Sequence, residues 1–441
     1  MGSASKKDSE IDWISKLPED IHHEILSHLS TNDAIKTSVL SRSWRHKWTS
    51  LTNLDLINPI NIESFNDFIN RITKTRSLPF VKRFKLTLKR TYSCSTVESW
   101  IDAVIAYKIQ ELDLCNITCI PVRIPDCLFR CESLQVLKLG GLGCYEIPKT
   151  TFFLPNLKIL RLRSVRYLSE STLEGLLSSS RNLEELVLYN YFKTKTLYVR
   201  SSSLKVLKIQ MRNHLMMETT RVVIDAPQLE FLEFGSNDRR VVEIETNNLC
   251  SIVDVVLNLD LLLHCSIVQF LTNISKTVKA LTLSPNILED LFYASNTYMP
   301  SFPNLNQLVV SLFESGTSDL LNMLRILPNL KVLTLIRNVY RRVFSSESWD
   351  DEQNAVPQCL TSSVERFVFN GYSCCPIDVK MLEYVLKNAK VLKEIFIIAV
   401  CIKSSEEPVK EVLLNKLSVL PECRVKIEYA RSYEMYVDLS L

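Results

Sequence analysis

The amino-acid sequence predicts an α/β fold in which a short unit of three helices precedes an irregular solenoid of parallel strands. Three observations predict it. The motif L-x-x-L-x-L recurs along most of the 441 residues, and its copies are almost evenly spaced. The third observation is residues 11–51, which lie outside the repeat and carry helix-start signals and closely spaced tryptophans.

The repeat is clearest in "SLQVLKL" from Ser133, "NLKILRL" from Asn156 and "NLKVLTL" from Asn329. With weaker copies included, the first apolar positions fall at 51, 81, 109, 134, 157, 183, 204, 229, 252, 278, 305, 330, 364 and 392. Their mean spacing is about 26 residues, which is within the range of leucine-rich repeats. Leucine runs in an ordinary α/β protein are the alternative, and the even spacing disfavours it.

Each repeat should supply one short parallel strand, because the last two apolar residues of the motif alternate onto one strand face. The remaining residues should return as a helix or irregular segment, and stacked repeats should bury the apolar face together. Many leucine-rich repeats place Asn three residues after the last apolar strand position. Here Asn occurs at that place only at 237, 286 and 338, so we expect an irregular solenoid whose turns close by apolar packing.

Residues 11–51 predict three short helices. Pro18 suits the start of the first, where Ile21, Ile25 and Leu29 form one apolar stripe. Thr31 or Asn32 can begin the second, and Ser41 the third, which carries Trp44 and Trp48. About forty residues hide little apolar surface, so we expect a docking face for a separate protein. A cap on the solenoid is the alternative.

The same stretch resembles the F-box of plant proteins, with Leu17-Pro18-Glu19-Asp20-Ile21 and "TSVLSRSWRHKW" from Thr37. Ser43 departs from the resemblance, because plant relatives more often carry Arg there. The resemblance implies that a Skp-family adaptor binds here, through Leu17, Pro18, Ile21, Ile25, Leu26, Leu29, Val39, Leu40 and Trp44.

The carboxyl-terminal segments "VPQCLTSSVERFVFNGY" from Val356 and "KLSVLPECRVKIEY" from Lys416 resemble the FBD domain, and "CCPIDVK" departs from it. The chain as a whole is similar to the plant F-box/FBD/leucine-rich-repeat family. This resemblance implies a non-catalytic substrate receptor of a Skp-cullin-F-box ubiquitin ligase, with the adaptor, a cullin and unidentified target proteins as partners. A leucine-rich-repeat scaffold without a ligase role is the alternative.

These features divide the chain into a flexible tail (1–10), the F-box (11–51), leucine-rich repeats (52–354) and an FBD region that caps the solenoid (355–441). The repeat motif continues at Val364 and Val391, so we expect the FBD region to supply terminal repeats. "GGLGCYE" from Gly140 predicts a tight turn after a strand, because it lacks the third glycine of a phosphate-binding GxGxxG loop.

Composition excludes several other classes. The net charge is +3, so neither a nucleic-acid partner nor a strongly basic domain is indicated. No secretory signal or apolar span is evident, and thirteen cysteines suit a reducing, intracellular location in the nucleus or cytoplasm. Cys115, Cys119, Cys127 and Cys131 lack the CxxC spacing of zinc sites. We identify no catalytic motif and expect no cofactor and no membrane partner.

The outward strand positions suggest a second surface. Charged residues follow one another there on successive repeats, and parallel strands would bring them together on one face. The sequence predicts a target-binding or anion-binding patch, with an ordinary solvated face as the alternative. The residues concerned are Lys138, Arg161, Arg163, Glu185, Lys208 and Glu233.

Overall fold

A computed structural model describes residues 13–45, 47–57, 81–163, 165–166, 169–191, 196–211, 220–236, 242–259, 264–293, 299–312, 317–337, 355–373, 375–401 and 423–431. The chain forms two compact units, Met1–Lys193 and Thr194–Leu441. The boundary between the units lies inside the repeats and coincides with none of the domain boundaries expected from the sequence.

The first unit begins with the short helices η1 (Ile14–Lys16), α1 (Glu19–Ser27), α2 (Thr31–Lys36), η2 (Thr37–Val39) and η3 (Lys47–Ser50). Ser30 caps α2 by accepting a hydrogen bond from the Asp33 N–H, so the cap lies one residue before the predicted Thr31. The third predicted helix forms turns and a 3₁₀ segment instead. Trp44 and Trp48 are nevertheless both buried, because two successive turns can bring residues four apart to the same side just as a helix does.

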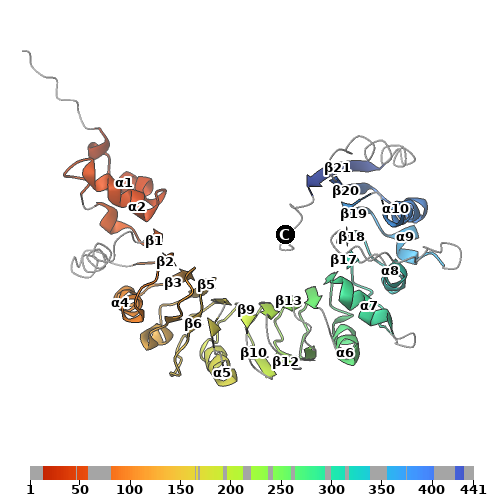
Figure 1. The fold of residues 1–441 in the computed structure, drawn as a ribbon, viewed down its shortest axis with the longest axis horizontal. Coiled ribbons are helices and arrows are strands. Elements are labelled where there is room, and N and C mark those ends of the chain that lie inside the picture. The colour runs from red at the N-terminus through yellow and green to blue at the C-terminus, as the bar shows by residue number, and fades with distance from the viewer. Residues whose placement is uncertain are drawn as a thin grey trace, which may run out of the picture. The chain divides into compact units, whose positions relative to one another are not determined.

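The main sheet of the first unit is parallel, in the order β1 (Asn53–Ile57), β2 (Arg83–Leu88), β3 (Glu111–Asn116), β5 (Val136–Gly141), β7 (Ile159–Arg163) and β9 (Glu185–Tyr191). The crossing segments contain α4 (Cys94–Ile105), η4 (Asp126–Arg130) and α5 (Glu170–Ser179). α4 and α5 lie on one side of this sheet, and the other side faces away from them (Figure 1). Short strands β4 (Val122–Arg123), β6 (Tyr145–Glu146) and β8 (Val165–Arg166) form a second parallel sheet.

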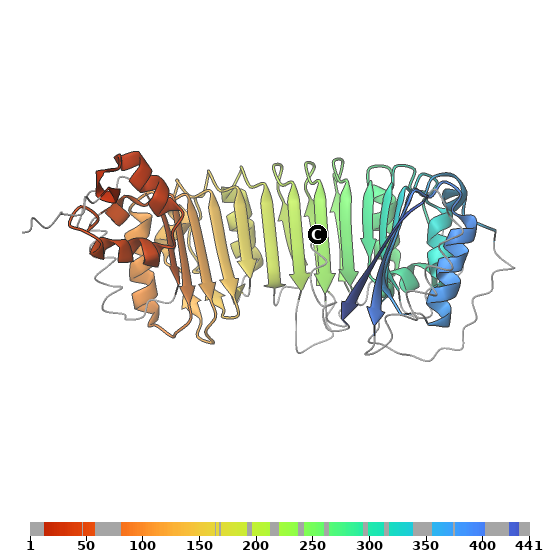
Figure 2. The ribbon, with the colours of Figure 1, turned by 90° about the horizontal axis from the view of Figure 1, so that it is seen from above.

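The second unit repeats this arrangement with β11 (Val206–Met211), β13 (Phe231–Ser236), β15 (Asp254–Leu259), β16 (Ala280–Leu283), β17 (Gln307–Leu312) and β18 (Val332–Arg337). The sheet continues through β19 (Arg366–Tyr372), β20 (Glu394–Cys401) and β21 (Arg424–Arg431). Neighbouring strands run in the same direction (Figure 2). Its helices are α6 (His264–Ile274), α7 (Pro285–Tyr293), α8 (Thr317–Arg325), α9 (Gln358–Ser362) and α10 (Pro376–Asn388).

The repeat prediction is confirmed strand by strand. Each of the fourteen predicted first positions lies two residues before a strand, from Leu51 before β1 to Leu392 before β20. The apolar positions of the motif are buried, as with Leu134, Leu137 and Leu139, each at most 1% exposed. Strand β21 was missed because Glu422 stands where the leading apolar residue would be expected.

Three crossing segments of the second unit are strands, where the sequence predicted helix or irregular chain. They are β10 (Thr196–Arg200), β12 (Thr220–Asp225) and β14 (Val242–Asn247), which pair in parallel with each other. Their sequences are rich in β-branched residues, which fit a pleated surface better than a helix, and buried positions alternate with less buried ones in β10 and in the first part of β14.

The FBD region is joined to the repeats by backbone pairing and by a buried ion pair. β19 pairs directly with β18, the last strand before it. At the end of β18, the Arg337 Nε lies 2.9 Å from Asp378 Oδ1 of α10, and both side chains are almost fully buried. Asp378 Oδ2 also accepts hydrogen bonds from the N–H and hydroxyl of Ser373. This segment continues the repeat core.

Candidate protein-interaction surfaces

The amino-terminal helices form a small core of their own. Leu26 and Trp44 are 0% and 2% exposed, and Trp48 and Ala34 are also buried. His22 lies among them, with its ring edge against Trp44 at a centroid distance of 4.9 Å. Its Nε2 is 2.8 Å from the Ile14 carbonyl and its Nδ1 is 2.8 Å from Lys47 Nζ. These contacts tie η1, α1 and η3 together.

The predicted placement of Leu26 and Trp44 on the adaptor-binding surface is therefore wrong. The resemblance assigned both residues to the adaptor-binding surface, but their side chains are inside the unit. Leu26 lies on the inner side of α1 and Trp44 packs against His22 of the same helix, while Ile21 and Ile25 are exposed. Both residues belong to the core of the unit.

All seven of the other predicted adaptor-binding residues are exposed apolar side chains. Their exposed fractions run from 37% to 86%, which is unusual for large apolar residues gathered in one small unit. The exposed members are Leu17, Pro18, Ile21, Ile25, Leu29, Val39 and Leu40. Trp13 and Ile14 are also exposed and were missed, because they stand alone before the Leu-Pro pair without a periodic pattern.

The unit is anchored to the first strand of the repeats. The Asp55 N–H of β1 donates to the Thr31 hydroxyl at 2.7 Å, across the contact between α2 and β1. Ser43, the residue that departs from plant F-boxes, donates to the Ser15 hydroxyl at 2.8 Å, and both hydroxyls lie near Ser41. Ser43, where the sequence departs from the resemblance, thus makes an internal contact.

Most of the second predicted surface lies in the first unit, on the sheet face opposite the helices, and Lys208 and Glu233 belong to the second unit. Strand register places Asp55, Lys85, Asp113, Lys138 and Arg161 in one row across β1 to β7. Acidic and basic residues alternate along most of this row. A second row, one pleat away on the same face, contains Arg83, Glu111 and Glu185.

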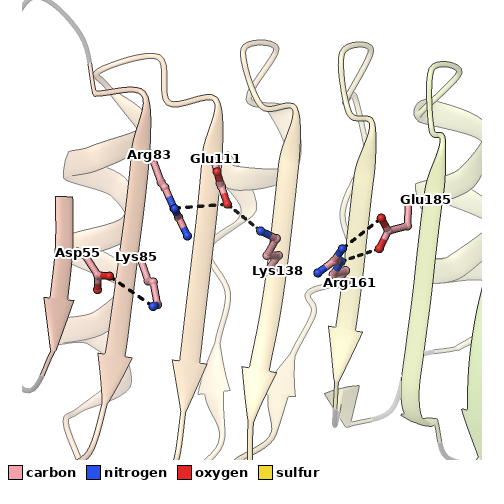
Figure 3. Close-up of polar contacts among 7 residues, drawn as sticks. All are labelled: Asp55, Arg83, Lys85, Glu111, Lys138, Arg161 and Glu185. Atoms are coloured by element: carbon pink, nitrogen blue, oxygen red, sulfur yellow. Dashed lines mark hydrogen bonds and ion pairs between the residues drawn. The ribbon is translucent and has the colours of Figure 1, made fainter. Parts of the chain in front are cut away.

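Ion pairs connect these rows, as Figure 3 shows. Glu111 accepts from Lys138 at 2.8 Å and lies 3.5 Å from Arg83, and Lys85 lies 3.4 Å from Asp55. The most specific contact is bidentate: Arg161 Nε and Nη2 donate to Glu185 at 2.6 and 3.2 Å. The Glu185 carboxylate raises the pKa of Arg161, whereas burial raises the pKa of Asp113 against the opposing effect of Lys138.

The structure thus pairs most of the predicted cations with carboxylates. Lys138 and Arg161 are paired in the first unit, and in the second unit Lys208 Nζ is 3.0 Å from Glu233 Oε2. Arg163 differs, since its guanidinium stacks over the Tyr189 ring at 4.7 Å. Because a bound anion would have to displace these carboxylates, the geometry favours the self-paired, solvated face over an anion site.

The acidic partners Asp55 and Glu111, and the cations Arg83 and Lys85, were missed by the sequence prediction. All four occupy outward positions between inward apolar residues of β1, β2 and β3. The same alternation of inward apolar and outward polar residues that predicted the strands would also have identified these outward positions. Whether a target binds this face stays a prediction.

Within the described ranges, no group of three or more His, Cys, Asp or Glu side chains could hold a metal ion. Over the same ranges, no helix is both long and apolar enough to cross a membrane. The glycine-rich loop is a tight turn, as predicted, with Gly141 at a φ of 107°.

Comparisons with known proteins agree with this architecture. Residues 14–56 match the F-box domain, residues 97–287 match the leucine-rich repeats described for the FBD-associated F-box protein At5g56370, and residues 352–397 match the FBD domain. The chain is 30% identical to F-box/LRR-repeat protein 13 of Arabidopsis thaliana, over 95% of each sequence. It is also 30% identical to F-box/FBD/LRR-repeat protein At2g26030 of the same plant, over 88% of this chain and 92% of that relative.

Fold and surfaces together define an F-box protein with leucine-rich repeats. The chain belongs to the F-box/FBD/LRR-repeat family. An F-box indicates binding to a Skp-family adaptor, and proteins with this domain are in general non-catalytic substrate receptors. The domains and relatives support a ubiquitin-ligase adaptor role.

Proposed function

We propose that this protein is the substrate-recognition subunit of a Skp-cullin-F-box ubiquitin ligase. Its amino-terminal helices bind the Skp-family adaptor, which connects it to the cullin, and its repeats bind the target protein. The chain performs no bond chemistry itself. Ubiquitin transfer is promoted by proximity, because binding raises the effective concentration of target lysines near the conjugating enzyme. This role requires an intracellular location, in the nucleus, the cytoplasm or both.

One observation carries the adaptor half of this proposal: the F-box unit has its own core and still exposes a group of large apolar side chains. Leu26, Trp44 and Trp48 already fill the interior, so Ile21, Val39 and Leu40 are not needed there. Each fully covered aliphatic side chain contributes about 1.5–3 kcal/mol, so a partner that covers several gains substantial affinity. The outward residues on η1, α1 and η2 are therefore the contact surface.

Loss of the adaptor should separate target binding from target degradation. In a variant with Val39→Asp and Leu40→Asp, apolar contact is replaced by charge at two of the most exposed positions. Proximity labelling with proteasome activity blocked should find the same targets with both proteins, and the adaptor and cullin only with the intact one. A Val391→Asp variant, changed at an exposed apolar residue of the second unit, is the matched control.

Target ubiquitination and lifetime are the decisive readouts. We expect targets of the intact protein and of the control to be ubiquitinated and short-lived, and targets of the Val39→Asp, Leu40→Asp variant to be stable. Equal lifetimes with all three proteins would leave a leucine-rich-repeat scaffold without a ligase role as the function.

A further inference from the structure

A second group of exposed apolar side chains lies where strands of the first unit end. Leu142 follows β5 and is 87% exposed, and Ile117 and Ile120 follow β3 and are 39% and 45% exposed. β3 and β5 are neighbours, with Asn116 opposite Gly141, so the two loops leave the sheet side by side. These residues belong neither to the buried core of the repeats nor to the exposed surface of the F-box unit.

Both loops are held in place by a buried asparagine. Asn116 Oδ1 accepts from the N–H and hydroxyl of Thr118 at 3.0 and 2.8 Å, and its Nδ2 donates to the Ile120 carbonyl at 2.9 Å. The Asn116 carbonyl accepts from the Gly143 N–H at 2.7 Å, which joins the second loop to the first. Side chains carried on such fixed loops lose little conformational freedom when a partner covers them.

Tyr145 and two glycines complete this support. The buried Tyr145 hydroxyl accepts from the Asn116 N–H at 2.8 Å and lies 2.7 and 2.8 Å from the carbonyl oxygens of Leu114 and Gly140. A Cβ at Gly141 would collide with the Asn116 backbone, and one at Gly143 with the Asn116 side chain. Three of the eight glycines in the chain surround Leu142, and the turn they permit points it outward.

Cations border these apolar residues. Lys89 and Arg90 follow β2, whose last residue, Leu88, accepts from the Ile117 N–H at 3.0 Å. Arg163 ends β7, and its side chain lies about 4 Å from the place of a Cβ on Gly140. None of the three is ion-paired to any residue that the structure describes. We name this set the strand-end surface: residues 89–92, 117–121, 142–144 and Arg163, which include no Asp or Glu.

We propose that the strand-end surface binds an acidic segment of a partner protein that carries apolar side chains. This inference rests on the proposed function and makes the partner's chemistry more specific: the segment belongs to the target. Charge complementarity favours an acidic segment, because its carboxylates would pair with Lys89, Arg90 and Arg163. Its Leu or Phe side chains would cover Leu142 and Ile120. An anionic membrane is less suited, since membrane attachment uses larger cationic clusters and an insertable apolar face.

The probe is a library of random 16-residue peptides displayed on phage and selected on the full-length chain. We expect the selected peptides to be acidic and to contain Leu, Ile or Phe. Selected peptides, made synthetically and fluorescently labelled, should lose about tenfold or more in affinity for a Leu142→Ser variant, because one exposed aliphatic side chain no longer becomes buried. Lys89→Glu should weaken them further, most strongly at low salt.

Two matched controls locate the effect. Phe153→Ser changes another exposed apolar residue of the first unit, and Lys158→Glu another exposed lysine, both outside the strand-end surface. Peptide affinity should be unchanged in both. Basic selected peptides, or affinities insensitive to Leu142→Ser, would overturn the proposal. So would binding to phosphatidylserine vesicles that is lost in the Leu142→Ser variant.

The same proteins distinguish this proposal from the proposed function. Adaptor binding, measured on the wild type and the Leu142→Ser variant, depends on the F-box and should be equal. If the adaptor binds but the peptides bind the Leu142→Ser variant as well as the wild type, the strand-end proposal is wrong and the proposed function stands. Peptide binding at the surface without any adaptor binding contradicts the ligase role and leaves the surface intact.

Discussion

The leucines of the repeats and the apolar residues of the amino-terminal helices follow regular spacings in the sequence, yet they end in opposite environments. Leu137 and Leu333, on strands of the two units, are fully buried, whereas Ile21 and Val39 are 45% and 86% exposed. Spacing tells which side chains share a face. It does not tell whether the chain itself covers that face, which depends on the neighbouring segments. In the repeats the neighbouring repeats cover it, whereas in the F-box unit the described residues leave it exposed, as the proposed binding to an adaptor requires.

The largest expected effect concerns the buried ion pair that joins the FBD region to the last repeat. Asp378→Ala leaves the buried Arg337 guanidinium without its carboxylate, and should lower the free energy of unfolding by about 3–5 kcal/mol. Glu185→Gln, at the half-exposed pair with Arg161, should cost at most about 1 kcal/mol. Urea denaturation followed by circular dichroism measures both.

A double variant, Arg337→Met with Asp378→Leu, sharpens this prediction. It removes both charges, so it should be more stable than Asp378→Ala alone. If Asp378→Ala unfolds no more easily than Glu185→Gln, the FBD region is not held by this pair and behaves as a separate domain.

The next effect contrasts a buried apolar residue of the repeats with an exposed one of the F-box unit. Leu137→Ala removes a fully buried side chain and should cost about 2–5 kcal/mol of stability. Val39→Ala removes an exposed one and should change stability by less than about 0.5 kcal/mol. A comparable loss in both variants, in the same denaturation experiment, would mean that Val39 is packed in solution and is not available to a partner.

The smallest effect concerns a surface residue that is engaged within the protein. Cys127 is exposed, yet its Sγ donates to Asp102 Oδ1 at 2.7 Å. Burial of the sulfur, together with the Asp102 carboxylate, raises the pKa of Cys127 to about 12. Since the thiolate is the reactive form, and a raised pKa keeps the thiol protonated, alkylation of Cys127 by iodoacetamide should be slow from pH 7 to 9.

The Asp102→Asn variant removes the carboxylate and keeps most of the burial. Its Cys127 pKa should fall, and alkylation at pH 8, measured by mass spectrometry, should become about tenfold faster. Identical rates in the wild type and the variant would show that the hydrogen bond to Asp102 does not persist in solution.

Fourteen strands of the main sheets were predictable from the motif, because stacking repeats require an apolar residue at fixed places such as Leu51 and Leu392. Strand β21 was not, since Glu422 interrupts the pattern. Helix and strand in the crossing segments were also hard to separate. The β-branched residues of β10 and β12 favour strand, yet such short segments form strands only where neighbouring repeats pair with them.

The candidate surfaces were predictable only in part. The α1 stripe showed that Ile21, Ile25 and Leu29 share a side, but which F-box residues are inside depends on how the turn at Trp44 folds back. The charged positions on the strands were visible, and their pairing was not, because a pair such as Arg161 and Glu185 depends on the register between two repeats. The strand-end surface depends on Asn116, whose contacts no spacing rule reveals.

We propose that the exposed apolar residues of the F-box unit are a binding surface and that the buried ones hold this surface in shape. Calorimetric titration of the full-length chain with a purified Skp-family adaptor tests it most directly, using Ile21→Ser with Val39→Ser, and Val391→Ser as the control. We expect the dissociation constant of the double variant to be at least about tenfold larger, with an unchanged melting temperature, and the control to have wild-type affinity. Equal affinity for all three proteins would contradict it.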